Sequence, residues 1–174
     1  MLARSALVLN PSYAAEFGQK PPIPFFEELI MTMLERAIAI AAAAHAGQVD
    51  KAGQPYILHP LRVMLRVTSV HERMAAVLHD VVEDTSVSLQ QLIAEGFPPQ
   101  VIAAVDALTK RPGESRAQAA QRASTNLIGR EVKLADNAEN MDLTRIQNPS
   151  ARDFARVEEY KVVREILLKG GTVS

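Results

Sequence analysis

The most informative stretch of this chain is Leu78-His79-Asp80-Val81-Val82-Glu83-Asp84-Thr85. It follows the apolar run Ala75-Ala76-Val77, so a helix that looks buried suddenly carries a histidine and three carboxylates. Residues four apart share a helix face, which places His79 above Glu83 and Asp80 above Asp84. Three acids near the carboxyl end of a helix oppose the helix dipole and repel one another. A compensating cation is therefore expected here, and the alternative is a solvated acidic helix end followed by a turn.

Length and composition describe an ordinary globular domain. The 174 residues suffice for one domain that buries roughly two-thirds of its unfolded surface. Hydrophobic residues make up 48% and charged residues 22% of the chain, as in typical globular proteins. The 19 basic and 20 acidic residues nearly balance, so the chain lacks the excess of positive charge that attracts a nucleic acid or an acidic membrane surface. We therefore expect neither partner.

The chain contains no cysteine, so any metal ion must be held by histidine and carboxylate ligands. The absence of cysteine is also compatible with a cytoplasmic location, which we expect. No apolar run is long enough for a secretory signal or a membrane span. We therefore expect a soluble protein.

The chain divides into an irregular N-terminal arm, residues 1–24, and a helical domain, residues 25–174. The arm is punctuated by Pro11, Pro21, Pro22 and Pro24 and lacks helical periodicity. Three interpretations stay open for it: a disordered tail, a segment that packs on a partner subunit, or an extension upstream of the true start. The arm and an apolar first helix suggest a homodimer.

Helical periodicity dominates from Phe25 onward, and no segment shows a sustained strand pattern. Proline, glycine and serine residues mark where helices begin and end. The expected helices cover 25–46, 59–67, the segment with the opening motif, 88–96, 98–108, a segment from Ser115, 131–143 and 150–169. The predicted fold is an all-α, single-domain helical bundle.

Other candidate metal ligands lie far from the opening motif. His45 ends the first apolar helix, His59 precedes Pro60, and Asp136 sits on an otherwise packable helix. A lone histidine at a helix end is more often a cap or a core residue than a ligand. His45, His79, Asp80 and Asp136 taken together suit Mn²⁺, Fe²⁺ or Zn²⁺ with open positions for water.

An order of His, then His-Asp, then a distant Asp resembles the HD phosphohydrolase superfamily. The resemblance narrows to the alarmone hydrolase domains of RelA/SpoT enzymes and the small alarmone hydrolases, and it covers about residues 33 to 165. The blocks that carry it are Ala44-His45-x-Gly47-Gln48, Lys51-x-Gly53-x-Pro55-Tyr56-Ile57-x-His59-Pro60, Leu78 to Thr85, Leu108-Thr109-Lys110 and Lys133-Leu134-Ala135-Asp136-x-x-x-Asn140. It implies an HD-type helical bundle.

The resemblance also implies roles for individual residues. His45, His79, Asp80 and Asp136 match the ligands of a single Mn²⁺, and His59 matches a structural residue that caps its helix. Glu83 and Asp84 match the acidic pair that orients and deprotonates the attacking water. The positions that match the nucleotide-binding site are Lys51, Tyr56, Lys110, Asn140 and Tyr160.

Several residues depart from the family pattern and leave the substrate base open. Asp50 stands where the family usually has an arginine that packs against guanine, and Asn137 and Glu139 replace a basic residue and a histidine or tyrosine. Asp142 replaces an arginine, although Arg145 lies one turn further on. Asp50 could instead accept a hydrogen bond from a base amino group, guanine's or adenine's.

The resemblance implies a metal-dependent hydrolase that removes the 3′-pyrophosphate from guanosine or adenosine alarmone nucleotides. The helical hydrolase takes up the length, so no synthetase domain is expected and the chain should degrade its nucleotide. One alternative is an HD phosphohydrolase that acts on another nucleotide or phosphoester. Another alternative is a nucleotide-binding regulator without turnover, although retention of Glu83 and Asp84 argues against it.

Overall fold

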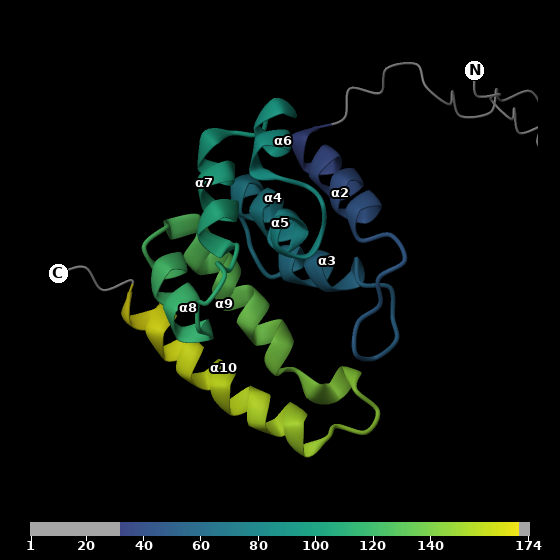
Figure 1. The fold of residues 1–174 in the computed structure, drawn as a ribbon, viewed down its shortest axis with the longest axis vertical. Helices are drawn as coiled ribbons and strands as arrows, with labels where there is room; N and C mark the ends of the chain where they lie inside the picture. The colour runs from purple at the N-terminus through teal and green to yellow at the C-terminus, as the bar shows by residue number, and fades with distance from the viewer. Residues whose placement is uncertain (1–31, 171–174) are drawn as a thin grey trace, which may run out of the picture. The chain divides into compact units, whose positions relative to one another are not determined.

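The computed structural model describes residues 32–170, which form a bundle of helices (Figure 1). In chain order these are α2 (Met33–Ala44), α3 (Leu58–Leu65), α4 (Val70–Leu78), α5 (Val81–Asp84), α6 (Leu89–Ala94), α7 (Pro99–Leu108), α8 (Arg116–Ser124), α9 (Leu127–Met141), the 3₁₀ helix η1 (Leu143–Arg145) and α10 (Ala151–Lys169). Extended pairing within these residues is limited to one isolated bridge between Val49 and Pro55. The predicted all-α fold is confirmed. The proposed arm, residues 1–24, and the expected helix start at Phe25 lie outside the described residues.

Most helices begin at a residue whose side chain satisfies free backbone N–H groups. Reciprocal capping boxes open α2, α4, α6, α8 and α10, with Thr32, Ser69, Ser88, Ser115 and Ser150 as the N-caps. Each such cap stabilises its helix by roughly 1 kcal/mol. The capping box predicted from Ser88 and Gln91 is confirmed.

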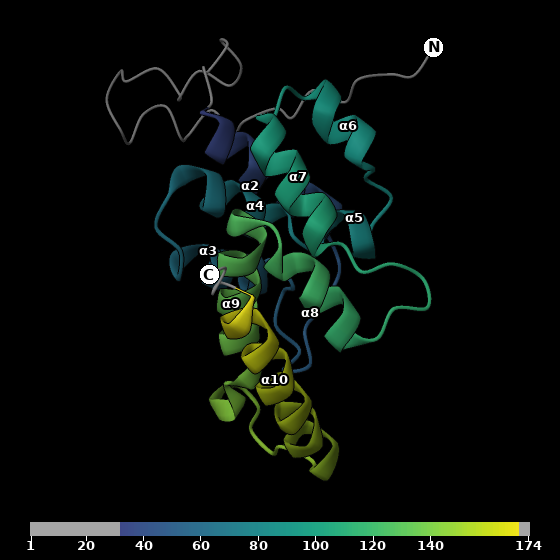
Figure 2. The same ribbon diagram turned by 90° about the vertical axis from the view of Figure 1, so that its left-hand side faces the viewer.

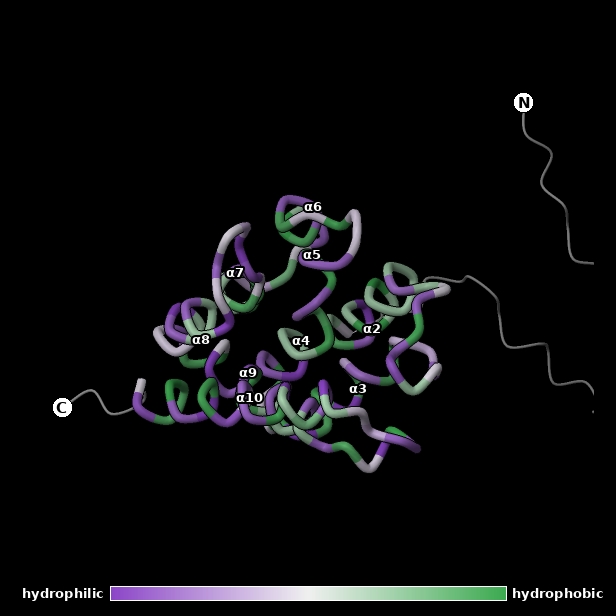
Figure 3. Tube along the Cα trace, turned by 60° about the horizontal axis from the view of Figure 1, so that its bottom comes forward, coloured by the Kyte–Doolittle hydropathy of each residue, from purple (hydrophilic) through white to green (hydrophobic). Residues whose placement is uncertain are grey.

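Helix α4 forms the centre of the larger hydrophobic core and contacts α2, α3, α7 and α9. Its last residues, Met74 to Leu78, are all buried. Figure 3 shows the contrast with α10, whose colour alternates between hydrophilic and hydrophobic along its length. The backbone that leaves α4 toward α5 is therefore held by packing on several sides.

A second, smaller apolar cluster joins α8 and α10 through Ala120, Ala123, Val163 and Leu167. Helix α10 also lies along α9, and Figures 1 and 2 show it beside both helices. No helix within residues 32–170 is long and apolar enough to cross a bilayer.

The helix boundaries differ from the prediction at two places that matter for the site. The expected single helix through the opening motif is divided, because α4 ends at Leu78 and α5 starts at Val81. Helix α3 begins at Leu58, so Pro60 occupies its third position and not its first. The division places His79 and Asp80 in a short link whose backbone keeps helical dihedral angles.

Candidate metal centre and substrate pocket

Three helical segments bring two histidines and an aspartate together. His59 from α3, His79 from the link between α4 and α5, and Asp136 from α9 place one ligand atom each within 4.8 Å of one another. The Nε2 atom of His59 lies 3.2 Å from Asp136 Oδ1, and Nε2 of His79 lies 3.7 Å from the same oxygen. All three side chains are buried. Buried polar atoms that converge in this way are typical of a metal site.

The hydrogen bonds of His79 leave one ring nitrogen free for a metal ion. Its Nδ1 lies 2.7 Å from the carbonyl oxygen of Ala76, so Nδ1 carries the proton and Nε2 carries a lone pair in the neutral ring. Nε2 is buried and makes no hydrogen bond within residues 32–170. Burial lowers the pKa of His79, but the carboxylates of Asp80 and Asp136 outweigh burial and raise the pKa to about 10. The site thus attracts positive charge at Nε2.

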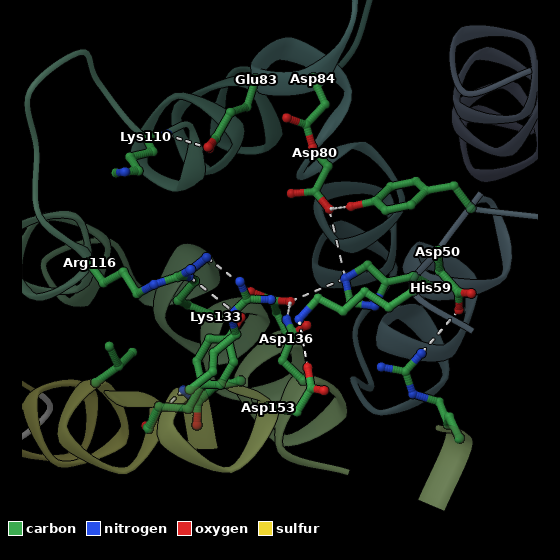
Figure 4. A pocket seen from close by; sticks show the side chains of 18 of the residues that line it. Asp50, His59, Asp80, Glu83, Asp84, Lys110, Arg116, Lys133, Asp136 and Asp153 are labelled. Carbon is green, nitrogen blue, oxygen red and sulfur yellow. Dashed lines mark hydrogen bonds and ion pairs between the residues drawn. The ribbon is translucent and has the colours of Figure 1, made fainter. Parts of the chain in front are cut away.

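Asp80 supplies a further carboxylate at the same place. Its Oδ2 lies 3.0 Å from His79 Nε2 and 3.7 Å from His59 Nε2. Tyr56 donates its hydroxyl proton to this oxygen over 2.6 Å. Burial acts to raise the pKa of Asp80, yet the facing His79 ring holds it below its usual range. Figure 4 shows Asp80, His59 and Asp136 facing one another across the middle of the pocket.

The carboxylate of Asp136 is held by two neighbours on its own helix. Lys133 Nζ lies 2.9 Å from Oδ2, and Asn140 Nδ2 donates to Oδ1 over 2.5 Å. Burial acts to raise the pKa of Asp136, but the Lys133 ammonium and the two histidines hold it well below its usual range. Lys133 and Asn140 therefore orient the carboxylate toward the histidines.

The structure corrects the role predicted for His59. The N-cap of α3 is Ile57, and no side chain caps that helix, so His59 does not act as its cap. Its ring instead faces His79, with 5.3 Å between the ring centroids. The sequence offered His59 as a candidate ligand, but its position before Pro60 favoured a structural role for it.

His45 was predicted as a ligand, but it does not belong to the group that the structure brings together. It follows the last turn of α2, where its Nδ1 lies 2.9 Å from Gln48 Oε1 and its ring packs against Tyr56. Its Nε2 is buried and has no hydrogen-bond partner within residues 32–170. The geometry favours His59 over His45 as the second histidine ligand.

Glu83 and Asp84 lie on α5, one turn beyond the link, and both face the pocket (Figure 4). Glu83 accepts a hydrogen bond from the backbone N–H of Lys110 over 2.8 Å, which holds its carboxylate in place. Burial, with the charges of Asp80 and Glu83, raises the pKa of Asp84. A carboxylate with a raised pKa is a better proton acceptor than an ordinary aspartate.

All the predicted nucleotide-binding residues reach one cavity of about 440 Å³ beside these carboxylates. The predicted members of its lining are Asp50, Lys51, Tyr56, Lys110, Asn140 and Tyr160. The cavity also has cationic side chains to which the sequence assigned no role, namely Lys133, Arg116, Arg145 and Arg156. The spacing of these residues along the chain does not predict that they share a site. Lys133 does lie within one of the sequence blocks that resemble the alarmone hydrolases.

Residues 37–131 of the chain match the HD domain family. That match covers more than half of the chain and includes His59, His79 and Asp80. The chain belongs to the HD domain family.

Several relatives of this HD domain carry names of alarmone enzymes. It is 34% identical over 173 residues to a GTP pyrophosphokinase of Streptomyces coelicolor, which covers 92% of this chain and 19% of that protein. It is 43% identical over 75 residues to a guanosine-3′,5′-bis(diphosphate) 3′-pyrophosphohydrolase of Haemophilus influenzae, over 41% of this chain and 11% of that protein. The HD domain chain thus spans about a fifth, or less, of the length of these relatives.

The fold of the HD domain is also found in a solved structure of a metazoan ortholog of SpoT that hydrolyzes ppGpp. The TM-score is 0.63 at 24% sequence identity, over 80% of this chain and 85% of that one. The predicted resemblance to HD-superfamily alarmone hydrolase domains is confirmed by these relatives.

Proposed function

We propose that this HD domain hydrolyses the 3′-pyrophosphate group of guanosine or adenosine nucleotides with the help of one Mn²⁺ ion. The observation that carries the proposal is the convergence of two histidines and two carboxylates beside an acidic pair; all of these residues except His79 line one cavity that also has cationic side chains. The names of the relatives support the same substrate class. The absence of cysteine is compatible with a reaction in the cytoplasm.

The residues present fit a divalent ion. His59, His79, Asp80 and Asp136 would hold it, because the unpartnered Nε2 of His79 points where the two carboxylates converge. Imidazole and carboxylate ligands without thiolates suit Mn²⁺. When bound, such an ion polarises a phosphoryl oxygen and lowers the pKa of bound water from about 16 to about 7.

The acidic pair acts on the attacking water, and the cationic side chains act on the phosphates. Glu83 and Asp84 orient the attacking water and accept its proton. The water oxygen forms a bond to the phosphorus that carries the 3′ oxygen, and the bond from that phosphorus to the 3′ oxygen breaks. The 3′ oxygen leaves with a proton as the nucleoside hydroxyl, and the pyrophosphate departs with the water oxygen. Lys110 and Lys133 offset the charge of the phosphates in the cavity.

Release of pyrophosphate from 3′-pyrophosphorylated guanosine and adenosine nucleotides, measured with added Mn²⁺ and with a chelator, tests the proposal. We expect metal-dependent release from at least one nucleotide and a loss of about a hundredfold or more in Glu83→Gln, since the water loses its acceptor. Glu158→Gln, an exposed site on α10, is the matched control and should leave the rate unchanged. Nucleotide binding without turnover in the wild type would indicate a regulator, and turnover of other phosphoesters alone would indicate a different HD phosphohydrolase.

A further inference from the structure

A network of charged side chains surrounds Arg145, which lines the cavity together with Asp50. Arg145 Nη1 donates to Asp50 Oδ2 over 3.1 Å, and its Nε lies 3.6 Å from Glu139 Oε1. Arg62 joins the same two acids, 2.5 Å from Glu139 and 3.7 Å from Asp50. Glu139 is only 2% exposed, so its charge depends on these guanidinium groups. Segments about ninety residues apart in the chain therefore meet around Arg145.

The network orients the Arg145 guanidinium and leaves part of it available. Within residues 32–170 its one side-chain hydrogen bond is from Nη1 to Asp50, while Nε lies 3.6 Å from Glu139 without a hydrogen bond. The side chain is 22% exposed, and Arg145 lines the cavity. A guanidinium that is held on one side presents its remaining N–H groups in a set direction.

The surroundings of Arg145 suit a flat neutral ring better than a phosphate. Val49, Leu143 and Ile146 line the same cavity; Val49 precedes Asp50, Ile146 follows Arg145, and Leu143 lies two residues before Arg145. The carboxylates of Asp50 and Glu139 offset most of the positive charge of Arg145, Arg62 and Arg66, so this end of the cavity attracts a polyanion less than free guanidinium groups would. Apolar walls around one oriented polar group are typical of pockets for an organic ring.

More cationic side chains that could bind phosphate groups lie on the other side of the cavity. Figure 4 shows Lys110 and Arg116 on the opposite side of His59 and Asp136 from Asp50. Arg156 and Lys133 line the cavity as well. The cavity thus offers a cationic region for the phosphates and the Arg145 end for the base.

We propose that Arg145 is the specificity-determining residue for the base of the nucleotide, with Asp50 and Glu139 as its positioning residues. The inference rests on the proposed function and adds the side chain that recognises the base. Guanine presents two neighbouring acceptors, O6 and N7, which an arginine binds well. Adenine replaces O6 with an amino donor, which would face the donor groups of Arg145. The site should therefore prefer guanine.

The contacts of Asp50 exclude the role that the sequence suggested for it. Its Oδ1 accepts hydrogen bonds from the backbone N–H groups of Ala52 and Gln54, and its Oδ2 faces Arg145 and Arg62. The side chain is 9% exposed. Both oxygens are already satisfied within the protein, so Asp50 does not accept a hydrogen bond from an adenine amino group.

Binding of guanosine 5′-diphosphate and adenosine 5′-diphosphate to the full chain, measured by calorimetry, tests the inference without any turnover. We expect the wild type to bind the guanosine nucleotide about tenfold or more tightly, as one good arginine–guanine contact allows. Arg145→Gln should raise the Kd for the guanosine nucleotide to about that of the adenosine nucleotide. Arg145→Lys should lie between the two, because lysine lacks the planar fork. Arg164→Gln, on the exposed face of α10, is the matched control and should change neither Kd.

Steady-state kinetics then separate a specificity role from a structural one. Glu139→Gln should raise KM for the guanosine substrate and leave kcat within about threefold, since the ion pairs of Glu139 are with Arg62, Arg66 and Arg145 and not with the proposed metal ligands. Equal binding of both bases by the wild type, or an unchanged base preference in Arg145→Gln, would overturn the inference while leaving the proposed hydrolysis intact. A retained guanine preference without any pyrophosphate release would overturn the proposed function and support the role of Arg145.

Discussion

The histidines of this chain differ in what their two ring nitrogens touch. His79 donates a hydrogen bond from Nδ1 to a backbone carbonyl, which directs its buried Nε2 at two carboxylates. His59 directs Nε2 at Asp136. His71 is half-buried and lies near Gln100. The environment of each ring therefore makes His59 and His79 the histidines that we propose as metal ligands.

Replacement of single histidines tests the ligand set. We expect His59→Ala and His79→Ala to weaken Mn²⁺ binding by at least about a hundredfold, since a first-row ion loses a direct ligand. His45→Ala should retain binding within about tenfold, because its contacts are to Gln48 and Tyr56. Calorimetric titration of each metal-free variant with Mn²⁺ gives the Kd. Loss of binding in His45→Ala with retention in His59→Ala would restore the ligand set predicted from the sequence.

Helix α8 stabilises the end of α7 through one arginine. Arg122 donates hydrogen bonds to the carbonyl oxygens of Asp106, Ala107 and Thr109, which are free at the carboxyl end of α7. It also pairs with Glu114 at 2.7 Å. This contact fixes the loop that carries Lys110, whose N–H group holds Glu83. A structural ion pair thus supports the acidic pair at the site.

The stability of this connection should depend on pH. Hydrogen bonds from Arg122 and from the backbone N–H of Arg111 lower the pKa of Glu114 from 4.5 to about 2. A carboxyl group with a lowered folded-state pKa stabilises the protein above its unfolded pKa, and this contribution is lost as pH falls. We expect Glu114→Gln to lower the melting temperature at pH 7, with the difference from wild type disappearing between about pH 4.5 and pH 2. Thermal melts across this range measure it, and a constant difference would contradict the role of the ion pair.

Helix boundaries were largely predictable because caps and breakers act locally. The N-caps Ser88, Ser115 and Ser150 mark helix starts that the structure confirms. The break between α4 and α5 was not predictable, because the residues of the link keep helical backbone angles and a helical pattern. Helix α9 starts at Leu127, earlier than the expected Glu131, because Asn126 caps it through the N–H of Gly129.

At the scale of the whole molecule, the proposed metal site joins segments that the hydrophobic core and the ion pairs of Glu139 also hold together. The proposed ligands come from α3, the link after α4, and α9, and all these segments pack around α4. Two buried carboxylates repel each other there in the absence of a cation. Metal binding should therefore stabilise the entire fold and not one loop.

Addition of Mn²⁺ should raise the melting temperature of the metal-free protein. Ligand at about a hundredfold over Kd stabilises a folded state by about 2.7 kcal/mol. Asp136→Asn should remove most of this increase, since the variant loses one ligand charge. Calorimetric melts with Mn²⁺ and with a chelator measure the effect. An equal increase in wild type and Asp136→Asn would place the ion at another site.

The amino-acid sequence by itself determined the helical class, most helix ends and the His79-Asp80 pair that marks the HD domain. These features depend on periodicity, caps and short motifs, which act over a few residues. Only the tertiary structure brought His59, and not His45, beside His79 and Asp136, and only it joined Arg145 to Asp50 and Glu139. The reason is physical: a ligand set and an ion-pair network are defined by atoms a few ångströms apart, and these residues meet only when α3, α9 and η1 pack together.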